Sequence, residues 1–182
     1  MSDIKTLKMY AKNRKLPEVL KLGMIPLDWV TSAKHLAESL PNTSEAALHQ
    51  RVEQNVTGTE IVDYDTLTEF YNQRYLTDIE LPNEIKKLQG VHHLRFGVLQ
   101  KGATIPFHLD EPFTLRFLCM VSGTHTFYVE TGDAYEMQPG ELWFINGSFK
   151  HSIENTSTHD RIALLGKFDN SEYNLRLINE LL

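Results

Sequence analysis

A change of pattern near Val91 divides this chain of 182 residues into two unlike parts. From Val91 onward, short runs rich in β-branched and aromatic residues alternate with turn residues such as Gly102, Gly123 and Gly132. About seven such runs at regular spacing are typical of a β-sandwich or barrel rather than of alternating βαβ units. The pattern therefore predicts a mainly β fold with a double-stranded β-helix, or jelly-roll, core.

The predicted strands lie in seven runs: HHLRFGVL (92–99), KGATIPFHLDEPF (101–113), TLRFLCMVSG (114–123), HTFYVETGD (125–133), AYEMQPGELWFI (134–145), NGSFKHSIENTS (146–157) and DRIALLGKF (160–168). Turn residues between these runs support their separation into strands.

The first ninety residues have a helical pattern instead. In IPLDWVTSAKHLAESL (25–40), apolar residues recur at a spacing of three to four before Pro41, which predicts an amphipathic helix. Further helices are expected over EAALHQRVEQ (45–54), over TLTEFYNQRYL (66–76) and over SEYNLRLINELL (171–182). We therefore predict a single domain over 1–182, in which a mainly helical part (1–90) and a C-terminal helix (171–182) accompany a jelly-roll core (91–170).

Charge and composition limit the partners of the chain. The formal net charge is -6, from 18 basic and 24 acidic residues, and this gives little support for nucleic-acid binding. No apolar run approaches the roughly 20 residues of a membrane helix, and the basic N-terminus is not followed by the apolar segment of a secretory signal. A single cysteine, Cys119, forms no intrachain disulfide and suits a reducing compartment. We expect a cytoplasmic protein with no nucleic-acid or membrane partner.

Three residues have the character of a metal site. His108 and Asp110 are two residues apart in a predicted strand, so both side chains can reach one ion from the same face. His151 begins another β-rich run about forty residues later. Two imidazoles and one carboxylate are the ligands of non-haem iron(II) oxygenases and leave three coordination positions open. We therefore predict that His108, Asp110 and His151 are the metal ligands and form the catalytic centre. Taken alone, a His-x-Asp pair is more often incidental.

Arginines in the predicted strands are candidates for anion binding. Arg161 opens the apolar strand RIALLGKF and shares a face with Ala163 and Leu165. A buried guanidinium is costly unless an anion meets it, although a surface salt bridge at a strand end is the simpler alternative. Beside an iron centre, the natural anion is the distal carboxylate of 2-oxoglutarate. Arg116 is a second, weaker candidate, and Arg95 could face either this cosubstrate or a substrate carboxylate.

The stretch from about Arg95 to Phe168 resembles the aspartyl/asparaginyl β-hydroxylase-like family of iron(II)/2-oxoglutarate-dependent dioxygenases. The matching elements are KGATIPFHLD (101–110), Arg116, GELWFINGSFKH (140–151), Asn155 and Arg161. The resemblance implies that His108, Asp110 and His151 bind Fe(II) and that Arg161, assisted by Arg116, binds 2-oxoglutarate. It also implies a hydroxylase that consumes O2 and 2-oxoglutarate, releases succinate and CO2, and acts on a free amino acid or on an amino-acid side chain.

Two other functions fit part of the same pattern. Gly102, followed by His108 and Asp110, partly matches the first cupin signature, which would indicate a metal-dependent isomerase or a small-ligand-binding protein. The cupin signature gives no reason for an arginine at position 161, so Arg161 distinguishes the dioxygenase from the cupin-type alternative. The third alternative is a metal-free jelly-roll interaction protein, in which the three side chains would not converge.

Overall fold

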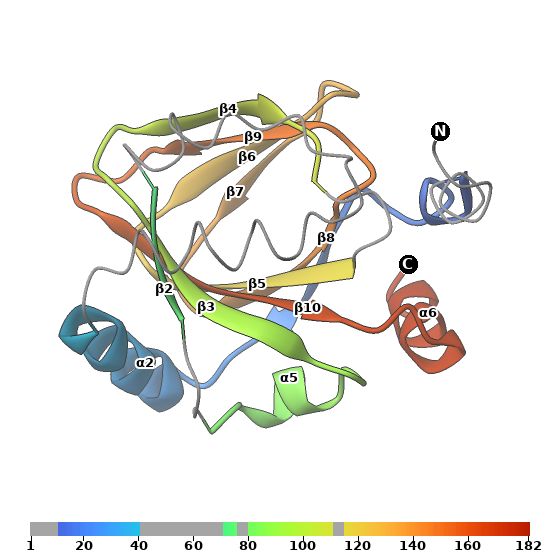
Figure 1. The fold of residues 1–182 in the computed structure, drawn as a ribbon, viewed down its shortest axis with the longest axis horizontal. Helices are drawn as coiled ribbons and strands as arrows, with labels where there is room; N and C mark the ends of the chain where they lie inside the picture. The colour runs from blue at the N-terminus through green and yellow to red at the C-terminus, as the bar shows by residue number, and fades with distance from the viewer. Residues whose placement is uncertain (1–10, 41–70, 76–79, 111–114) are drawn as a thin grey trace.

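The computed structural model describes residues 11–40, 71–75, 80–110 and 115–182, and in them two antiparallel sheets face each other (Figure 1). The six-stranded sheet has the order β1-β8-β5-β10-β3-β2, and the four-stranded sheet has the order β4-β9-β6-β7. The predicted mainly β, jelly-roll fold is confirmed. The strands are β1 (Val19–Met24), β2 (Tyr71–Tyr75), β3 (His92–Leu99), β4 (Thr104–His108), β5 (Leu115–Ser122), β6 (His125–Val129), β7 (Ala134–Met137), β8 (Glu141–Asn146), β9 (His151–Asn155) and β10 (Arg161–Phe168).

Each of the seven predicted β-rich runs contains at least one strand. The run AYEMQPGELWFI contains two, β7 and β8, because Pro139-Gly140 makes a turn in its middle. Gly140 has φ +87° there, a backbone conformation that side chains other than glycine rarely adopt. The two strands then belong to different sheets, so this turn carries the chain from one layer to the other.

The N-terminal part is less helical than predicted. Helix α2 (Leu27–Ser39) is confirmed, but β1 is a strand within the part predicted to be mainly helical. The helix predicted over 66–76 is wrong for 71–75, which form β2. Both strands lie at edges of the six-stranded sheet, where pairing with β8 or β3 satisfies backbone groups and overrides a helical spacing of side chains. The helix predicted over 45–54 lies outside the described residues.

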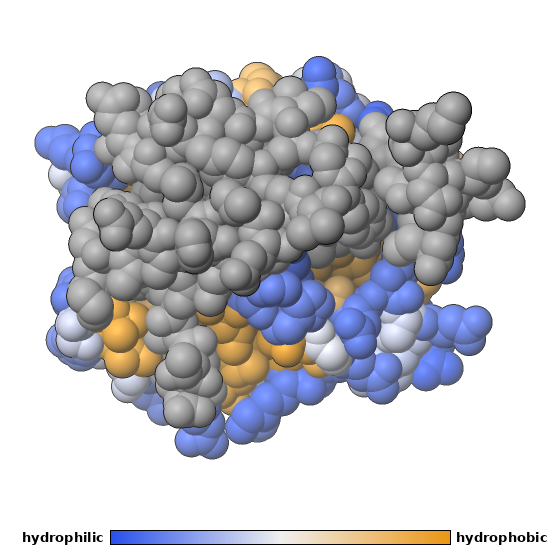
Figure 2. All heavy atoms as spheres, in the orientation of Figure 1, coloured by the Kyte–Doolittle hydropathy of each residue, from blue (hydrophilic) through white to orange (hydrophobic). Residues whose placement is uncertain are grey.

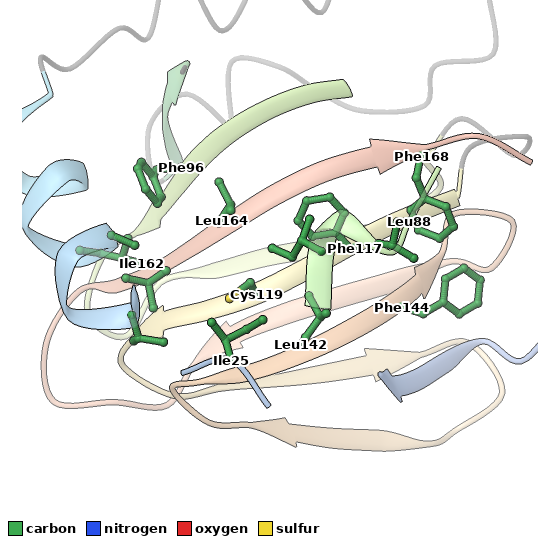
Figure 3. Close-up of a cluster of buried hydrophobic side chains, with 14 of the residues drawn as sticks. Ile25, Leu88, Phe96, Phe117, Cys119, Leu142, Phe144, Ile162, Leu164 and Phe168 are labelled. Atoms are coloured by element: carbon green, nitrogen blue, oxygen red, sulfur yellow. The ribbon is translucent and has the colours of Figure 1, made fainter. Parts of the chain in front are cut away.

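Helices cover the outer face of the six-stranded sheet. Besides α2, these are α5 (Asn83–Lys86) and α6 (Glu172–Asn179). Helix α6 confirms the predicted C-terminal helix. A core cluster joins Val30 and Ala33 of α2, Ile85 of α5 and Ile178 of α6 to the outward side chains of β3, β5, β8 and β10. Figure 3 shows the centre of this cluster, with Cys119 among the aromatic and aliphatic side chains. On the face drawn in Figure 2, apolar residues lie in the lower half, bordered by hydrophilic ones.

A second core cluster fills the space between the two sheets. Its members include Leu118, Met120 and Ala163 from the six-stranded sheet, and Phe127 and Ile153 from the four-stranded sheet. Because side chains alternate along a strand, residues two apart from these also face the interior. No helix in the described part of the chain is long and apolar enough to cross a membrane.

Candidate metal centre

His108, Asp110 and His151 converge at one end of the interior. His108 is the last residue of β4 and pairs with His151, the first residue of β9. Asp110 lies two residues beyond the end of β4, and its Oδ1 is 3.8 Å from Nε2 of His108. Its Oδ2 is 3.5 Å from Nε2 of His151, and one ligand atom from each residue lies within 4.8 Å of the others. The structure therefore brings the three predicted ligands together in a geometry that could hold one metal ion.

The two imidazoles are oriented in the same way. Nδ1 of His108 lies 2.8 Å from the carbonyl oxygen of Pro106, and Nδ1 of His151 lies 3.0 Å from that of Phe149. A carbonyl oxygen only accepts, so Nδ1 carries the proton and donates in both residues. Nε2 therefore keeps its lone pair, which is the atom that a metal binds when the other ring nitrogen is fixed by a hydrogen bond.

Burial keeps His151 neutral. Its exposed fraction is 3%, and its ring stacks on that of Phe127 with centroids 4.8 Å apart. Burial, followed by the neighbouring His108 and Arg116, lowers the pKa of His151 to about 4, against the opposing effects of Asp110 and of the bond to Phe149. Near neutral pH the imidazole can bind a metal without first losing a proton.

Arg116 contacts the predicted carboxylate ligand. It lies on β5, on the inner face of the sheet, and its Nη1 is 2.7 Å from Oδ2 of Asp110. A carboxylate has two oxygens with about four lone-pair directions, so one side of it can accept from a guanidinium while the other faces a metal. The structure thus places Arg116 against Asp110, and the predicted role of Arg116 in binding 2-oxoglutarate stays a prediction.

Arg161 is fully buried between the sheets. As the first residue of β10 it shares the inner face with Ala163, and its exposed fraction is 0%. Its Nη1 donates to the carbonyl oxygen of Gly97 over 3.3 Å. The surface salt bridge considered as the simpler alternative is therefore excluded, because the side chain has no exposure to solvent.

Asn155 fixes the loop that leads into β10. Its Nδ2 donates to the carbonyl oxygens of Leu99 (2.9 Å) and His159 (3.0 Å), while its Oδ1 accepts from the backbone N–H of Ser157 (3.0 Å). One buried amide thus ties β3 to the β9–β10 loop. These bonds hold the start of β10, and with it the backbone of Arg161, in a defined position.

Arg95 and Lys167 add two more buried cations to the inner face. Arg95 lies opposite Leu165, and Lys167 lies opposite Arg116, in the register of β10 with its neighbours. The sequence analysis named Arg95 but missed Lys167. The inward alternation of Arg161, Ala163 and Leu165 extends to position 167 and was the signal that could have found it.

His125 was also missed. It lies on β6, shares the inner face with Phe127 and is fully buried. The alternation of apolar residues in HTFYV places it inside, although a single histidine gives no further sign of a role.

A surface cavity of about 740 Å³ lies apart from these residues. It is lined by Lys34 and Glu38 of α2 and by Val98 and Ile162 of the outer core cluster, among others. Its walls contain none of the predicted site residues.

The comparison with protein families adds to this geometry. The family described as aspartyl/asparaginyl beta-hydroxylase matches residues 73–170, more than half of the chain. The chain belongs to this family. The matched residues of this β-hydroxylase family member include the three converging side chains and both Arg116 and Arg161. A hydroxylase of this family with a candidate His/Asp/His metal site is thereby supported.

Comparison with individual proteins is less specific. No curated protein matches the chain. Among solved structures, a predicted oxalate decarboxylase of Thermotoga maritima is 20% identical, with 54% of this chain and 79% of that chain covered and a TM-score of 0.42. The Cnp3 cupin domain of Schizosaccharomyces pombe is 15% identical, with 58% and 70% covered and a TM-score of 0.43. Lactobacillus farciminis oxalate decarboxylase is 16% identical, with 57% and 30% covered and a TM-score of 0.43.

Proposed function

We propose that this family member is an iron(II)/2-oxoglutarate-dependent dioxygenase that hydroxylates an aliphatic carbon of an amino acid. The observation that supports this most directly is the convergence of His108, Asp110 and His151, with the metal-binding Nε2 of each imidazole left open by its Nδ1 hydrogen bond. This donor set suits iron(II) and leaves three positions for other ligands. We also propose the cytoplasm as its location.

When bound, ferrous iron would activate O2 so that one oxygen atom enters a C–H bond of the substrate and the other enters succinate, formed with CO2 from 2-oxoglutarate. The two histidines and Asp110 would hold the ion. Arg116 would keep Asp110 in place through its 2.7 Å contact, and one negative ligand would offset part of the charge of the metal.

Arg161 would bind the distal carboxylate of 2-oxoglutarate. The guanidinium is fully buried between the two sheets, where a two-pronged contact with a carboxylate is strong, and one end of a dicarboxylate would bind there while the other end would lie at the metal. Two apolar residues of the inner core cluster, Ala163 and Met120, lie on the same face as Arg161. Such surroundings exclude water from the bound cosubstrate.

The inner-face cations favour a substrate with a carboxylate. Lys167 lies opposite Arg116 in the strand register, and Arg95 lies opposite Leu165 of the same strand as Lys167, so the inner face carries positive charge that would attract a substrate carboxylate. Free amino acids carry such a group, and we propose one as substrate in preference to a residue of a peptide. Arg95 is the residue that we propose for the substrate carboxylate.

The test is to measure succinate formation against a panel of free amino acids with added iron(II) and 2-oxoglutarate. We expect one amino acid to raise succinate formation well above the rate without it and to yield a product that is heavier by one oxygen atom. A His151→Ala variant serves as the matched control and should show neither effect. If the iron-loaded protein neither binds 2-oxoglutarate nor forms succinate, the cupin-type isomerase or small-ligand-binding protein becomes the better proposal.

A further inference from the structure

His125 lies deep inside the sandwich with half of its hydrogen-bonding capacity unused. Its exposed fraction is 0%, and its Nε2 is 3.2 Å from the thioether sulfur of Met137. Among the residues that the structure describes, its Nδ1 has no hydrogen-bond partner. A thioether is a weak acceptor, so the contact with Met137 compensates little of what the ring lost on leaving water. A buried polar atom of this kind calls for a partner.

His125 lies in the neighbourhood of Arg161. Gly123, two residues earlier, approaches Arg161 so closely that a Cβ on this glycine would be 3.0 Å from the Cα of Arg161. The β5–β6 turn therefore packs directly on the start of β10. Burial first, and then the positive charge of Arg161, lowers the pKa of His125 well below its ordinary value, so the imidazole is neutral. A neutral imidazole has one N–H to donate.

We propose that His125 is a second binding residue for the distal carboxylate of the 2-oxo dicarboxylate, and that it donates its Nδ1–H beside the guanidinium of Arg161. This inference rests on the proposed function. A carboxylate accepts hydrogen bonds from several donors at once, so an imidazole N–H and a guanidinium can share it. When the hydrogen is on Nδ1, Nε2 does not donate to the sulfur of Met137, so this tautomer loses only that weak contact.

The arrangement implies selection of the cosubstrate by its distal charge. Two donors at this position favour a carboxylate, whereas a methyl group there would leave the Nδ1–H of His125 without an acceptor. We therefore expect the protein to bind 2-oxoglutarate much more tightly than 2-oxopentanoate, which has the same chain length and lacks the distal carboxylate.

The experiment measures the affinity of the manganese(II)-loaded protein for both 2-oxo acids by calorimetry, without turnover. In His125→Leu we expect binding of 2-oxoglutarate to weaken about tenfold or more, with binding of 2-oxopentanoate unchanged. His125→Asn should retain most of the parental affinity, because the amide N–H of asparagine stands close to the position of Nδ1. Met137→Leu is the matched control. It removes the sulfur contact of the other ring nitrogen and should leave both affinities as in the parent.

The outcomes separate the two proposals. If the parent protein does not bind 2-oxoglutarate, the proposed function fails. If the parent binds it and His125→Leu binds it equally well, the role of His125 is overturned. If a variant does not fold, a measurement on the parent protein still tests the inference. In the zinc(II)-loaded protein labelled with ¹⁵N-histidine, the His125 Nδ1 resonance should shift when 2-oxoglutarate is added and should not shift when 2-oxopentanoate is added. An unchanged resonance would overturn the inference as well.

Discussion

The guanidinium of Arg116 lies against the carboxylate of Asp110, with Nη1 and Oδ2 2.7 Å apart, and the same oxygen is 3.5 Å from Nε2 of His151. Asp110 lies beyond the end of β4, so strand pairing does not fix its position. The ion pair with a residue of β5 connects it to the rigid six-stranded sheet.

Arg116→Met should therefore weaken metal binding. Loss of a group that orients a metal ligand typically costs about 10- to 100-fold in metal affinity, and we expect a loss in this range. Anaerobic titration with iron(II) measures it. Arg176→Met is the control, because Arg176 makes an exposed ion pair with Glu180 and lies over the ring of Tyr173, and neither is a predicted site residue. Parental iron affinity in Arg116→Met would show that Asp110 holds its position without this contact.

Replacement of either histidine should remove the metal and leave the protein folded. His108→Ala and His151→Ala each take one of three ligands, and we expect iron stoichiometry and turnover to fall to background while circular dichroism stays parental. His151→Ala should also lower the melting temperature more than His108→Ala, since His151 is buried and stacked on Phe127. His35→Ala is the control, because it replaces an exposed histidine that is not a predicted ligand. Full iron binding in both variants would contradict the ligand assignment.

Arg161→Ala should raise the Michaelis constant for 2-oxoglutarate far more than it changes iron affinity. Removing one partner of a buried charge pair costs on the order of 2 to 5 kcal/mol, which corresponds to roughly thirtyfold or more in affinity. Arg161→Lys should recover only part of this, because an ammonium lacks the two-pronged grip of a guanidinium. Anaerobic titration of the iron(II) protein, followed through its charge-transfer absorption, gives the affinity directly. Equal affinity in Arg161→Ala and the parent would remove the main reason to prefer a dioxygenase to the cupin-type isomerase or small-ligand-binding protein.

The metal-free protein should lose stability as the pH falls from about 6.5 to about 4. In the unfolded chain His151 takes up a proton near its ordinary pKa of 6.5, while in the folded protein it stays neutral down to about 4. The unfolded state therefore binds more protons in this window. The free energy of unfolding decreases as the pH is lowered, by roughly 3 kcal/mol over the whole window. Urea unfolding with chelator at pH 7.5 and pH 5 measures the effect. His151→Gln, which has no such titration, should show a smaller decrease; an equal decrease in both proteins would contradict the assignment.

Cys119 should be inert in the folded protein. It is fully buried in the outer core cluster, and burial, with a further contribution from Glu84, raises the pKa of its thiol to about 12. Because the thiolate is the reactive form, we expect a thiol reagent to modify Cys119 only after the protein unfolds. Labelling followed by mass spectrometry, with and without denaturant, tests this. Rapid modification of the native protein would show that the outer face opens near β5.

Local patterns were sufficient for most of the core. The alternation of side chains and the Gly/Pro turns predicted where the strands from β3 to β10 lie, and the helical spacing predicted α2 and the C-terminal helix α6. These patterns are local because each strand or helix must bury one face. They failed at β2, where pairing with β3 outweighs the helical spacing of the apolar residues over 66–76.

The sequence by itself also determined the three residue types of the metal centre, since spacing and chemistry singled out His108, Asp110 and His151. The tertiary structure decided how they meet. Strict alternation would turn His108 away from the buried Ile105, three residues earlier, but the register of β4 with β9 shifts between these two residues and pairs His108 with His151.

The contacts of the arginines and of His125 likewise depend on the tertiary structure. Arg116 meets Asp110 through a link between β5 and the segment after β4, and His125 comes near Arg161 because Gly123 allows the β5–β6 turn to pack on the start of β10. Such contacts join segments that belong to different sheets, and the distance and relative angle of the sheets follow from the packing of the whole sandwich. No local spacing of residues contains that information.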